Sequence, residues 1–349
     1  MWWKFRKHKL ALACSVFVLG LYLVAGVCEF VAPYPLDHRL TALTYAPPQR
    51  LHFFSEEGFS LKPFVYALQG GRDPETLRKV YAEDTSQRYF VRFLVRGQPY
   101  CLWGLFKTDV HLFGVDQGAT IYLLGADSMG RDLLSRIIYG TRISLTVGLL
   151  GVALSFLLGV SMGLISGYHG GWVDNVIQRV IEVLRSFPSI PLWMALAAAL
   201  PQTWGPLKVY FGITVVLSFL AWTGLAREVR GRVLTLREED FTTAALLCGA
   251  STWRIMWRHL LPSVSSHIIV TMTLAIPHMI LAETALSFLG LGLRPPITSW
   301  GVLLKEASNV QAVAQQPWLL SPVIFVIMAV LAFNFIGDGL RDAADPYAR

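Results

Sequence analysis

Four polar side chains fall inside long apolar stretches of the sequence, where a polar group is costly and therefore informative. Glu283, His267 and His278 lie in one stretch, and Asn334 lies in another. A charged group in hydrocarbon costs about 3 kcal/mol or more, so such side chains should face the interior of a helix bundle or an aqueous cavity. Glu283 and Asn334 are therefore candidates for lining a transport path. For Glu283, a structural hydrogen bond between helices is the favoured alternative.

The sequence lacks the motifs of the common enzyme classes. It has no GxxxxGK[ST] phosphate loop, since the dipeptide Gly-Lys never occurs, and no GxSxG nucleophile motif. No HExxH or comparable ligand spacing is present either, so positions at the ends of spans, or a bond between helices, explain the histidines better than metal ligation. No pair of acidic residues in the long segment between the first two apolar stretches is placed for acid–base catalysis. We therefore expect no catalytic residue, no metal site and no cofactor bound by this chain.

The composition indicates a membrane protein. Of the 349 residues, 54% are hydrophobic and only 15% are charged, whereas soluble globular chains carry about 25% charged residues. The formal net charge of +7 would also suit a nucleic-acid-binding protein. However, basic clusters beside membrane spans explain this charge under the positive-inside rule. We therefore predict a multi-spanning membrane protein with no nucleic-acid partner.

Six apolar stretches are near the ~20 residues needed to cross ~30 Å of hydrocarbon. They are residues 10–31, 143–167, 176–200, 209–226, 265–289 and 319–336. An even number of spans places both termini on the same side. Basic residues cluster before the first span and after the fourth: Lys4, Arg6, Lys7, Lys9, Arg227, Arg230, Arg232, Arg237, Arg254 and Arg258. The positive-inside rule therefore predicts that both termini are cytoplasmic.

The first span is expected to be retained. Residues 3–9 are basic and residues 10–28 are apolar, as in a signal peptide, but this apolar run is longer than usual and has no convincing cleavage site. No CxxC pair occurs among the four cysteines, which are Cys14, Cys28, Cys101 and Cys248. A Cys28–Cys101 disulfide is conceivable, although unpaired apolar cysteines are the favoured interpretation.

Residues 34–124 separate the first two spans and are predicted to form a small α+β insert outside the cytoplasm. Residues 88–96 and 101–113 are rich in β-branched and aromatic side chains, which predicts two strands joined by a turn at residues 97–99. Residues 73–82 are predicted to form a short helix, because Asp and Pro occupy its first two positions.

Three further segments are predicted to be irregular or to lie on the membrane surface. Pro188 and Pro191 predict a kink in the third span, with the freed backbone groups facing protein or water. Residues 133–138 place their apolar side chains opposite charged ones, which predicts a helix lying on the outer surface. Residues 299–305 are expected to do the same, with Trp300 as an interfacial anchor under one interpretation.

A polar, arginine-rich segment, residues 239–262, stands out between the fourth and fifth spans. We predict two short helices separated by a tight turn at Gly249. Ser251 is placed to cap the second helix, and Pro262 is expected to end it.

The second of these helices is predicted to be amphipathic. Its apolar residues recur at helical spacing and form one stripe: Trp253, Met256, Trp257 and Leu260. Arg254 and Arg258 lie four residues apart on another face. By itself, this pattern fits a docking helix and an ordinary helix at the membrane surface equally well.

The motif in this segment resembles that of a known transporter family. Residues 243–249 (TAALLCG) and 260–262 (LLP) are similar to the Glu-Ala-Ala-x3-Gly…Leu-Pro signature of binding-protein-dependent ABC permeases, with Thr243 standing where many of them have Glu. The stretches at residues 125–145, 287–292, 295–301 and 337–346 look like the oligopeptide and dipeptide permeases. The resemblance covers residue 125 to the end, and residues 40–120 fit the family less well.

The resemblance implies a fold and a division into segments. The expected fold is an all-α membrane protein with six transmembrane helices of the type I ABC importer permease fold and a small α+β extracytoplasmic insert. Residues 1–33 would hold the cytoplasmic N-terminus and first helix, 34–124 the insert, and 125–349 the permease core in a bacterial inner membrane. The outer loop near Trp300 would then meet the substrate-binding protein or its ligand.

The resemblance also implies partners. The loop at residues 227–263 would dock onto an ATPase, with these residues carrying the contact: Asp240, Thr243, Ala244, Ala245, Gly249, Ser251, Trp253, Arg254, Trp257, Arg258 and Pro262. The expected partners are a second, homologous permease, two ATPase subunits that bind ATP and Mg²⁺, and an extracytoplasmic binding protein that delivers short peptides. Oligosaccharides, opines or nickel are alternative substrates, and a membrane-anchored ligand receptor or a membrane-embedded enzyme are other classes of function.

Overall fold

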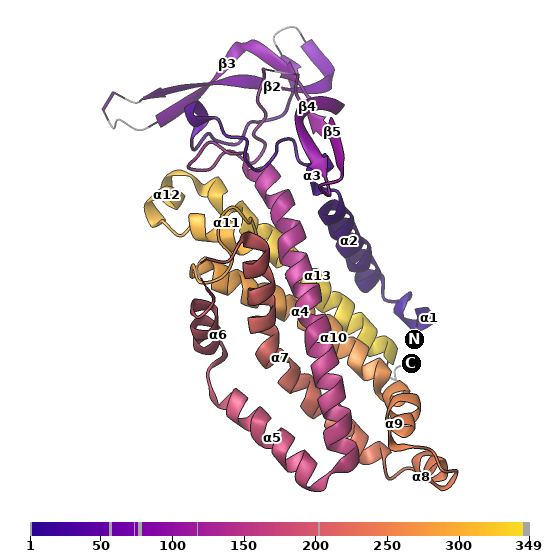
Figure 1. Cartoon of the computed structure of the whole chain (residues 1–349). Helices are drawn as coiled ribbons and strands as arrows, with labels where there is room; N and C mark the ends of the chain where they lie inside the picture. Colours follow the sequence, from indigo (N-terminus) through magenta and orange to yellow (C-terminus); the bar gives the residue numbers. More distant parts are fainter. Residues whose placement is uncertain are drawn as a thin grey trace. The chain divides into compact units, whose positions relative to one another are not determined.

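The computed structural model describes residues 2–55, 58–72, 74–75, 79–116, 118–201 and 203–344. The chain divides into two compact units. The first comprises Met1–Leu19, Leu145–Pro296 and Val326–Arg349, and the second comprises Gly20–Ser144 and Ile297–Phe325. Several long helices contribute residues to both units, and Figure 1 shows the elements by label and colour.

Long apolar helices dominate the described part of the chain. Among the described residues, five helical segments are long and apolar enough to cross a membrane: Lys9–Gly26, Leu133–His169, Pro206–Leu236, Thr252–Phe288 and Pro317–Ala344. They contain helices α2 (Lys9–Gly26), α4 (Leu133–His169), α7 (Pro206–Leu236), α10 (Leu261–Phe288) and α13 (Ser321–Ala344). These helices coincide with five of the six predicted spans.

The remaining predicted span is bent. Helices α5 (Gly171–Ser186) and α6 (Ser189–Ala198) meet at an angle of 88° and can together form a sixth crossing. Phe187, between them, has an extended backbone (φ −87°, ψ 138°), which is what a following proline imposes on its neighbour. The predicted kink at Pro188 is therefore confirmed.

Helix α4 is longer than the bilayer requires. Its 37 residues extend about 55 Å at 1.5 Å per residue, whereas the hydrocarbon core is about 30 Å thick. The separate surface helix predicted at residues 133–138 is therefore wrong, because these residues form the first turns of α4. Helix α7 likewise extends ten residues beyond the predicted end at residue 226, to Leu236.

Glycines allow α4 and α7 to pack closely. Gly159, Gly163 and Gly167 recur every four residues, on one face of α4. A Cβ atom at each would lie only 2.7–2.9 Å from a backbone carbonyl oxygen of α7. Any larger side chain would push the two helices apart. This stripe is the small-residue packing that membrane helices use in place of hydrophobic burial.

The part of the insert that the structure describes contains two small antiparallel sheets. One has the strand order β1–β2–β3, built from β1 (His52–Ser55), β2 (Gly58–Arg72) and β3 (Lys79–Phe90). The other pairs β4 (Arg92–Leu102) with β5 (Phe106–Gly114). The buried side chains of the insert include Phe64 and Val65 of β2, and Ile121 and Tyr122 of the loop that follows β5. The predicted mixture of helix and strand is therefore largely strand.

Local predictions within the insert were partly wrong. Residues 79–82 belong to β3 rather than to a helix, because they pair with residues 69–72 of β2; residues 73 and 76–78 lie outside the described residues. Residues 97–99 form an irregularity within β4 rather than a turn, and the turn lies at residues 103–105. Cys28 is buried, Cys101 is exposed and both are free thiols, so the disulfide does not form.

The shorter helices complete the structure. They are α1 (Trp2–Phe5), α3 (Cys28–Val31), η1 (Thr41–Leu43), α8 (Asp240–Leu247), α9 (Thr252–Ile255), η2 (Met256–Leu260), α11 (Trp300–Glu306), α12 (Val310–Gln315) and η3 (Pro317–Leu320). The predicted helix at residues 299–305 is confirmed as α11. However, Trp300 is fully buried and its backbone N–H donates to Ser144 Oγ at 3.1 Å. The interpretation of Trp300 as an interfacial anchor is therefore wrong.

Candidate functional site

The segment between α7 and α10 forms a helix, a turn and a second helix. Gly249 has φ +78°, and the backbone N–H groups of Gly249 and Ala250 donate to the carbonyls of Leu246 and Ala245. This left-handed glycine with crossed hydrogen bonds ends α8. Ser251 Oγ then accepts the backbone N–H of Arg254 at 3.4 Å. The predicted break at Gly249 and the predicted cap at Ser251 are both confirmed.

Pro262 does not end the second helix. A single π-helical turn, η2, joins α9 to α10, and the Leu261 N–H donates to the Met256 carbonyl five residues earlier. The wider turn accommodates a proline, which has no N–H to donate. The prediction that Pro262 closes the segment is therefore wrong. Instead, residues 252–288 form one continuous helical segment.

The predicted apolar stripe divides into a buried and an exposed part. Met256 and Leu260 are buried, together with Ile255, against Val229 and Val233 of α7. The side chains of Trp253 and Trp257 remain exposed, by 63% and 37%. Their rings lie against each other with centroids 5.1 Å apart. One face therefore fixes the segment to α7, and the other presents two tryptophans.

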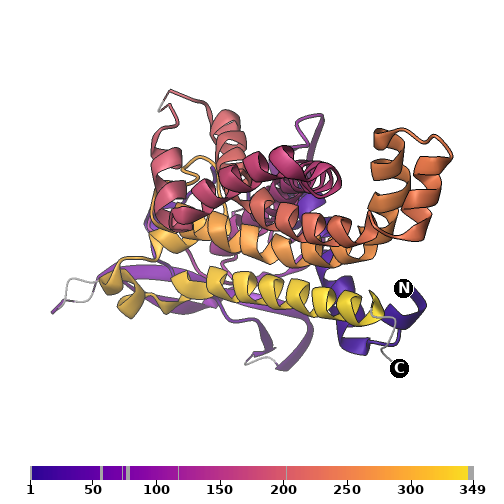
Figure 2. The same cartoon turned by 90° about the horizontal axis from the view of Figure 1, so that it is seen from below.

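The exposed face extends onto α8. Leu247 is 82% exposed, and Leu246 and Phe241 are also exposed. Figures 1 and 2 show α8 and α9 as a short pair set apart from the long helices at the point where α7 ends and α10 begins. All eleven residues predicted for docking are exposed except Ala245, which is half-buried. The pair is therefore an apolar and basic surface carried on a rigid support.

A cavity of about 670 Å³ lies among α4, α5, α6, α7 and α10 of the first unit. Most of its lining is apolar, but Arg185, Glu228, Thr271 and His278 also contribute. The Glu228 carboxylate accepts a hydrogen bond from Thr271 Oγ1 at 2.9 Å and lies 3.4 Å from His267 Nε2. The cavity therefore offers one anionic group, the Glu228 carboxylate, and one cationic group, the Arg185 guanidinium, to a small polar molecule.

The two residues predicted to line a path are placed differently. Glu283 is fully buried in α10 and accepts a hydrogen bond from Ser287 Oγ, one turn later, at 2.7 Å. This placement favours a structural role. Asn334 is half-buried in α13. Neither lines the cavity, whereas Glu228 does. The sequence prediction did not include Glu228, although its position as an acidic residue within a run of arginines could have indicated it.

A buried ion cluster occupies the start of α4 in the second unit. Arg136 donates to Asp127 at 2.6 Å and to both oxygens of Glu306 in α11, at 2.5 and 2.7 Å. The Asp127 carboxylate also accepts the backbone N–H groups of Met129 and Arg131. The charged residues near 133–138 therefore tie a loop, α4 and α11 together rather than facing solvent.

Asp132 lies beside this cluster and is itself buried. Burial raises the pKa of Asp132 to about 6, in spite of hydrogen bonds from Ser135 that favour the charged form. Its Oδ1 atom has no hydrogen-bond partner within the described residues. A carboxyl group in this setting is neutral over a wider pH range than a solvated one.

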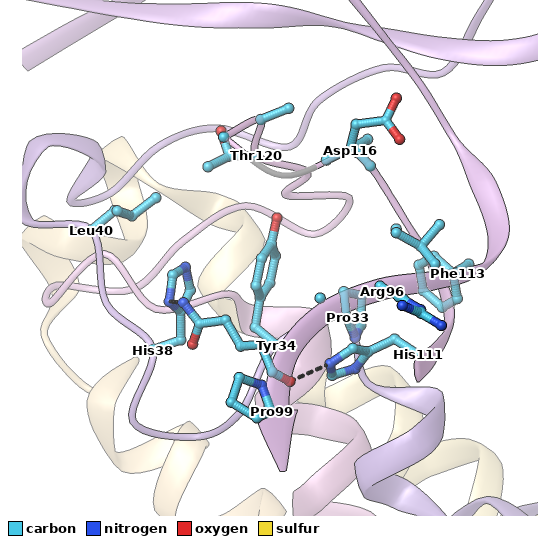
Figure 3. A pocket seen from close by; sticks show the side chains of 17 residues that line it. Pro33, Tyr34, His38, Leu40, Arg96, Pro99, His111, Phe113, Asp116 and Thr120 are labelled. Atoms are coloured by element: carbon cyan, nitrogen blue, oxygen red, sulfur yellow. Dashed lines mark hydrogen bonds between the residues drawn. The ribbon is translucent and has the colours of Figure 1, made fainter. Parts of the chain in front are cut away.

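A second cavity, of about 400 Å³, lies within the insert (Figure 3). At its edge, the ring of His111 is held between two carbonyl oxygens, that of Ala32 at 2.6 Å from Nδ1 and that of Gln98 at 2.9 Å from Nε2. His38, stacked on Tyr34, also lines it, and burial lowers the pKa of His38. These contacts join the segment after α3 to β4, so they are structural.

Two parts of this chain match models of known protein families. The family model described as "Binding-protein-dependent transport system inner membrane component" matches residues 159–349, more than half of the chain. The chain belongs to this family. A second model, the N-terminal transmembrane domain of oligopeptide transport permease C, matches residues 1–48. Residues 49–158, which include both sheets, lie outside these two matches. The chain is therefore a multi-pass component of the inner membrane.

Characterised relatives agree with this assignment. The oligopeptide transport system permease protein OppC of Haemophilus influenzae is 42% identical over 229 residues, 65% of this chain and 71% of that protein. The glutathione transport permease GsiD of Pectobacterium atrosepticum is 39% identical, over 65% and 73% of the two chains. The dipeptide permease DppC of Lactococcus lactis is 40% identical, over 69% and 68%. The family is one of ABC transport permeases that work with other ABC subunits, and it is not a known enzyme family.

A solved structure of the MetNI methionine ABC transporter, in an inward-facing conformation, aligns with 62% of this chain and the whole of its own. Its TM-score is 0.49 and its sequence identity is 17%. The assignment to the permease family rests on the sequence matches.

Proposed function

We propose that this chain forms half of the translocation path of an ATP-driven importer of short peptides, and that α8 and α9 receive the motion of an ATPase subunit. The partners would be a second homologous permease, two ATPases that bind ATP and Mg²⁺, and an extracytoplasmic binding protein. The observation that carries the proposal is the exposed face formed by Trp253 of α9 and Trp257 of η2, on a helical segment that continues into a membrane-spanning helix.

The docking role follows from exposure and rigidity. Two neighbouring tryptophans, whose rings are tilted against each other, and an 82% exposed leucine are costly to leave in water and suit a cleft of another protein. Arg254 and Arg258, beside them, can pair with acidic residues at the rim of such a cleft. Because α9, η2 and α10 form one helical segment, a displacement of the tryptophans would be transmitted to the membrane span without passing through a flexible loop.

The peptide substrate is supported by the relatives and by the cavity. The relatives include permeases named for oligopeptides, dipeptides and glutathione. A short peptide carries an ammonium group at one end and a carboxylate at the other. Glu228 and Arg185 offer the two opposite charges in one cavity, so they are candidates for contacting the two ends during passage.

Orientation is part of the proposal. Both termini and α8–α9 would face the cytoplasm, because the arginines that follow the fourth span cluster there. The two exposed free cysteines provide a test, since Cys248 follows α8 and Cys101 lies in β4. A charged, impermeant maleimide added to intact cells should label Cys101 and should reach Cys248 only after the membrane is opened. Labelling in the reverse order would overturn the orientation.

The docking proposal is tested by replacing both Trp253 and Trp257 with alanine. We expect co-purification of the ATPases and peptide uptake to be lost, with normal amounts of the chain in the membrane. Trp172 of α5, which is 78% exposed, is the matched control, and Trp172→Ala should retain both. Unchanged uptake in the double variant would contradict the docking role.

The substrate proposal is tested separately by Glu228→Gln. We expect about tenfold weaker uptake of unmodified short peptides, equivalent to about 1.4 kcal/mol, while assembly with the ATPases is unaffected. Glu182→Gln, at an exposed position in α5, is the control. Competition by an oligosaccharide, an opine or nickel, but not by peptides, would support an alternative substrate without affecting the docking result.

A further inference from the structure

The turn that joins β4 to β5 has an unusual composition. Its residues are Trp103, Gly104 and Leu105, between Leu102 at the end of β4 and Phe106 at the start of β5, whereas hairpin turns are ordinarily built from polar residues and glycine. Leu105 is 76% exposed and Trp103 is 58% exposed. Trp103 also adopts a left-handed backbone conformation, with φ +53°, which is a costly outlier for a bulky residue. An apolar, strained and exposed tip calls for an explanation outside the sheet itself.

The position of this tip is defined by helix α2. The indole N–H of Trp103 donates to the carbonyl oxygen of Gly26 at 2.6 Å, and Gly26 is the last residue of α2. Figure 1 shows the hairpin ending beside the junction of α2 and α3. With 18 residues, α2 is about 27 Å long, close to the ~30 Å thickness of the hydrocarbon core. Gly26 therefore marks one boundary of that core.

A half-buried ion pair marks the same boundary. Arg142 of α4 donates to the Gly26 carbonyl at 3.0 Å and forms two hydrogen bonds, of 2.5 and 2.6 Å, with the Glu29 carboxylate. Such charges are stable where headgroups and water begin. The Trp103 indole shares the Gly26 carbonyl with this pair. It therefore lies in the layer where tryptophans of membrane proteins are enriched.

We propose that the β4–β5 tip inserts into the lipid interface at the end of α2, with Trp103 at headgroup level and Leu105 and Phe106 among the first acyl-chain segments. The occupant is lipid because the tip continues a lipid-facing surface: Leu23, one turn before Gly26, is 64% exposed on α2. Lys107 follows the apolar residues and is exposed, so its ammonium group can reach a lipid phosphate. The insert is thereby held to the membrane surface by a third point, in addition to its two connecting helices.

The depth of the tip can be measured with a spin label. Cys14, Cys101 and Cys248 are replaced by serine, Leu105→Cys is labelled, and the full-length chain with its co-purifying subunits is placed in liposomes of phosphatidylethanolamine and phosphatidylglycerol. Phe54→Cys, in β1 of the other sheet, is the matched control because Phe54 is equally apolar and 72% exposed. Phe106→Cys provides a second position in the tip.

We expect spin labels at the β4–β5 tip and at Phe54 to differ in which relaxation reagent reaches them. Labels at Leu105 and Phe106 should be more accessible to oxygen, which dissolves in lipid, than to a water-soluble nickel chelate, and the label at Phe54 should show the reverse. If the labels at both tip positions were more accessible to the nickel chelate than to oxygen, the tip would lie in water and the proposal would be overturned. Exclusion of both reagents would mean that a protein covers the tip, which would also overturn it.

Discussion

Two clusters of arginine and aspartate, one in each unit, use the same chemistry at different degrees of burial. In the second unit, Arg136 and Asp127 form an ion pair whose side chains are only 2% and 1% exposed. In the first unit, Arg230 of α7 donates two hydrogen bonds of 2.5 Å to Asp174 of α5. Its side chain is 29% exposed. The geometry is equally good in both, so the difference lies in access of water.

The difference predicts how each cluster responds to the loss of one partner. A charge left alone in a buried site keeps its full desolvation cost, about 3–5 kcal/mol. A charge left alone near the surface is largely rehydrated, and exposed pairs contribute only about 0–1 kcal/mol. The Arg136 cluster should therefore be essential for folding around α4 and α11, while the Arg230 cluster should modulate how α5 is held against α7.

The largest effect is expected for Arg136→Met. This variant leaves Asp127 buried without its main cation, so the free energy of unfolding should fall by about 3–5 kcal/mol. The measurement is thermal unfolding of the purified chain in detergent. Arg131→Met is the control, because Arg131 contacts the same two carboxylates but its side chain is 16% exposed. An equal loss of unfolding free energy in the two variants would mean that burial does not explain the effect of Arg136→Met.

A pH-dependent effect is expected from Asp132. Burial raises the pKa of Asp132 to about 6 from 3.8 in the unfolded chain, so the folded state binds more protons. The stability from this group is therefore fully present below about pH 4 and is lost as the pH rises through 6. The shift of about two pKa units corresponds to at most about 3 kcal/mol. In Asp132→Asn, the midpoint of thermal unfolding should depend less on pH between pH 4 and 7 than in the unaltered chain. An unchanged pH profile would contradict the raised pKa of Asp132.

The smallest effect is expected in the first unit. Asp174→Asn retains the hydrogen bond with Ser166 in part and leaves a guanidinium that water can reach. We therefore expect a loss of about 1 kcal/mol, reduced further by salt. Arg92→Gln, at an ion pair whose side chains are more than half exposed, is the reference for no measurable change. A loss for Asp174→Asn as large as that for Arg136→Met would mean that the partial exposure of Arg230 does not matter.

Features that depend on neighbours along the chain were predicted well. Five spans, the kink at Pro188, the turn at Gly249 and the cap at Ser251 each follow from a local property, namely apolar length, a proline, or a residue suited to one backbone position. The errors involved longer-range partners. Residues 79–82 have a helical start signal upstream, but pairing with β2 makes them a strand. Trp300 has the composition of an interfacial anchor, but α11 buries it within its unit.

The sequence by itself determined that the chain spans a membrane, belongs among the permeases and carries a helix–turn–helix between its fourth and fifth spans. Hydropathy, glycine and capping residues act over a few residues, so they can be read in order. Tertiary structure alone decided which charged residues meet. Glu228 faces a cavity, Glu283 is buried, and Arg136 reaches a glutamate 170 residues away. Burial and pairing depend on packing between distant segments, and this sets whether a charge is structural or available to a ligand.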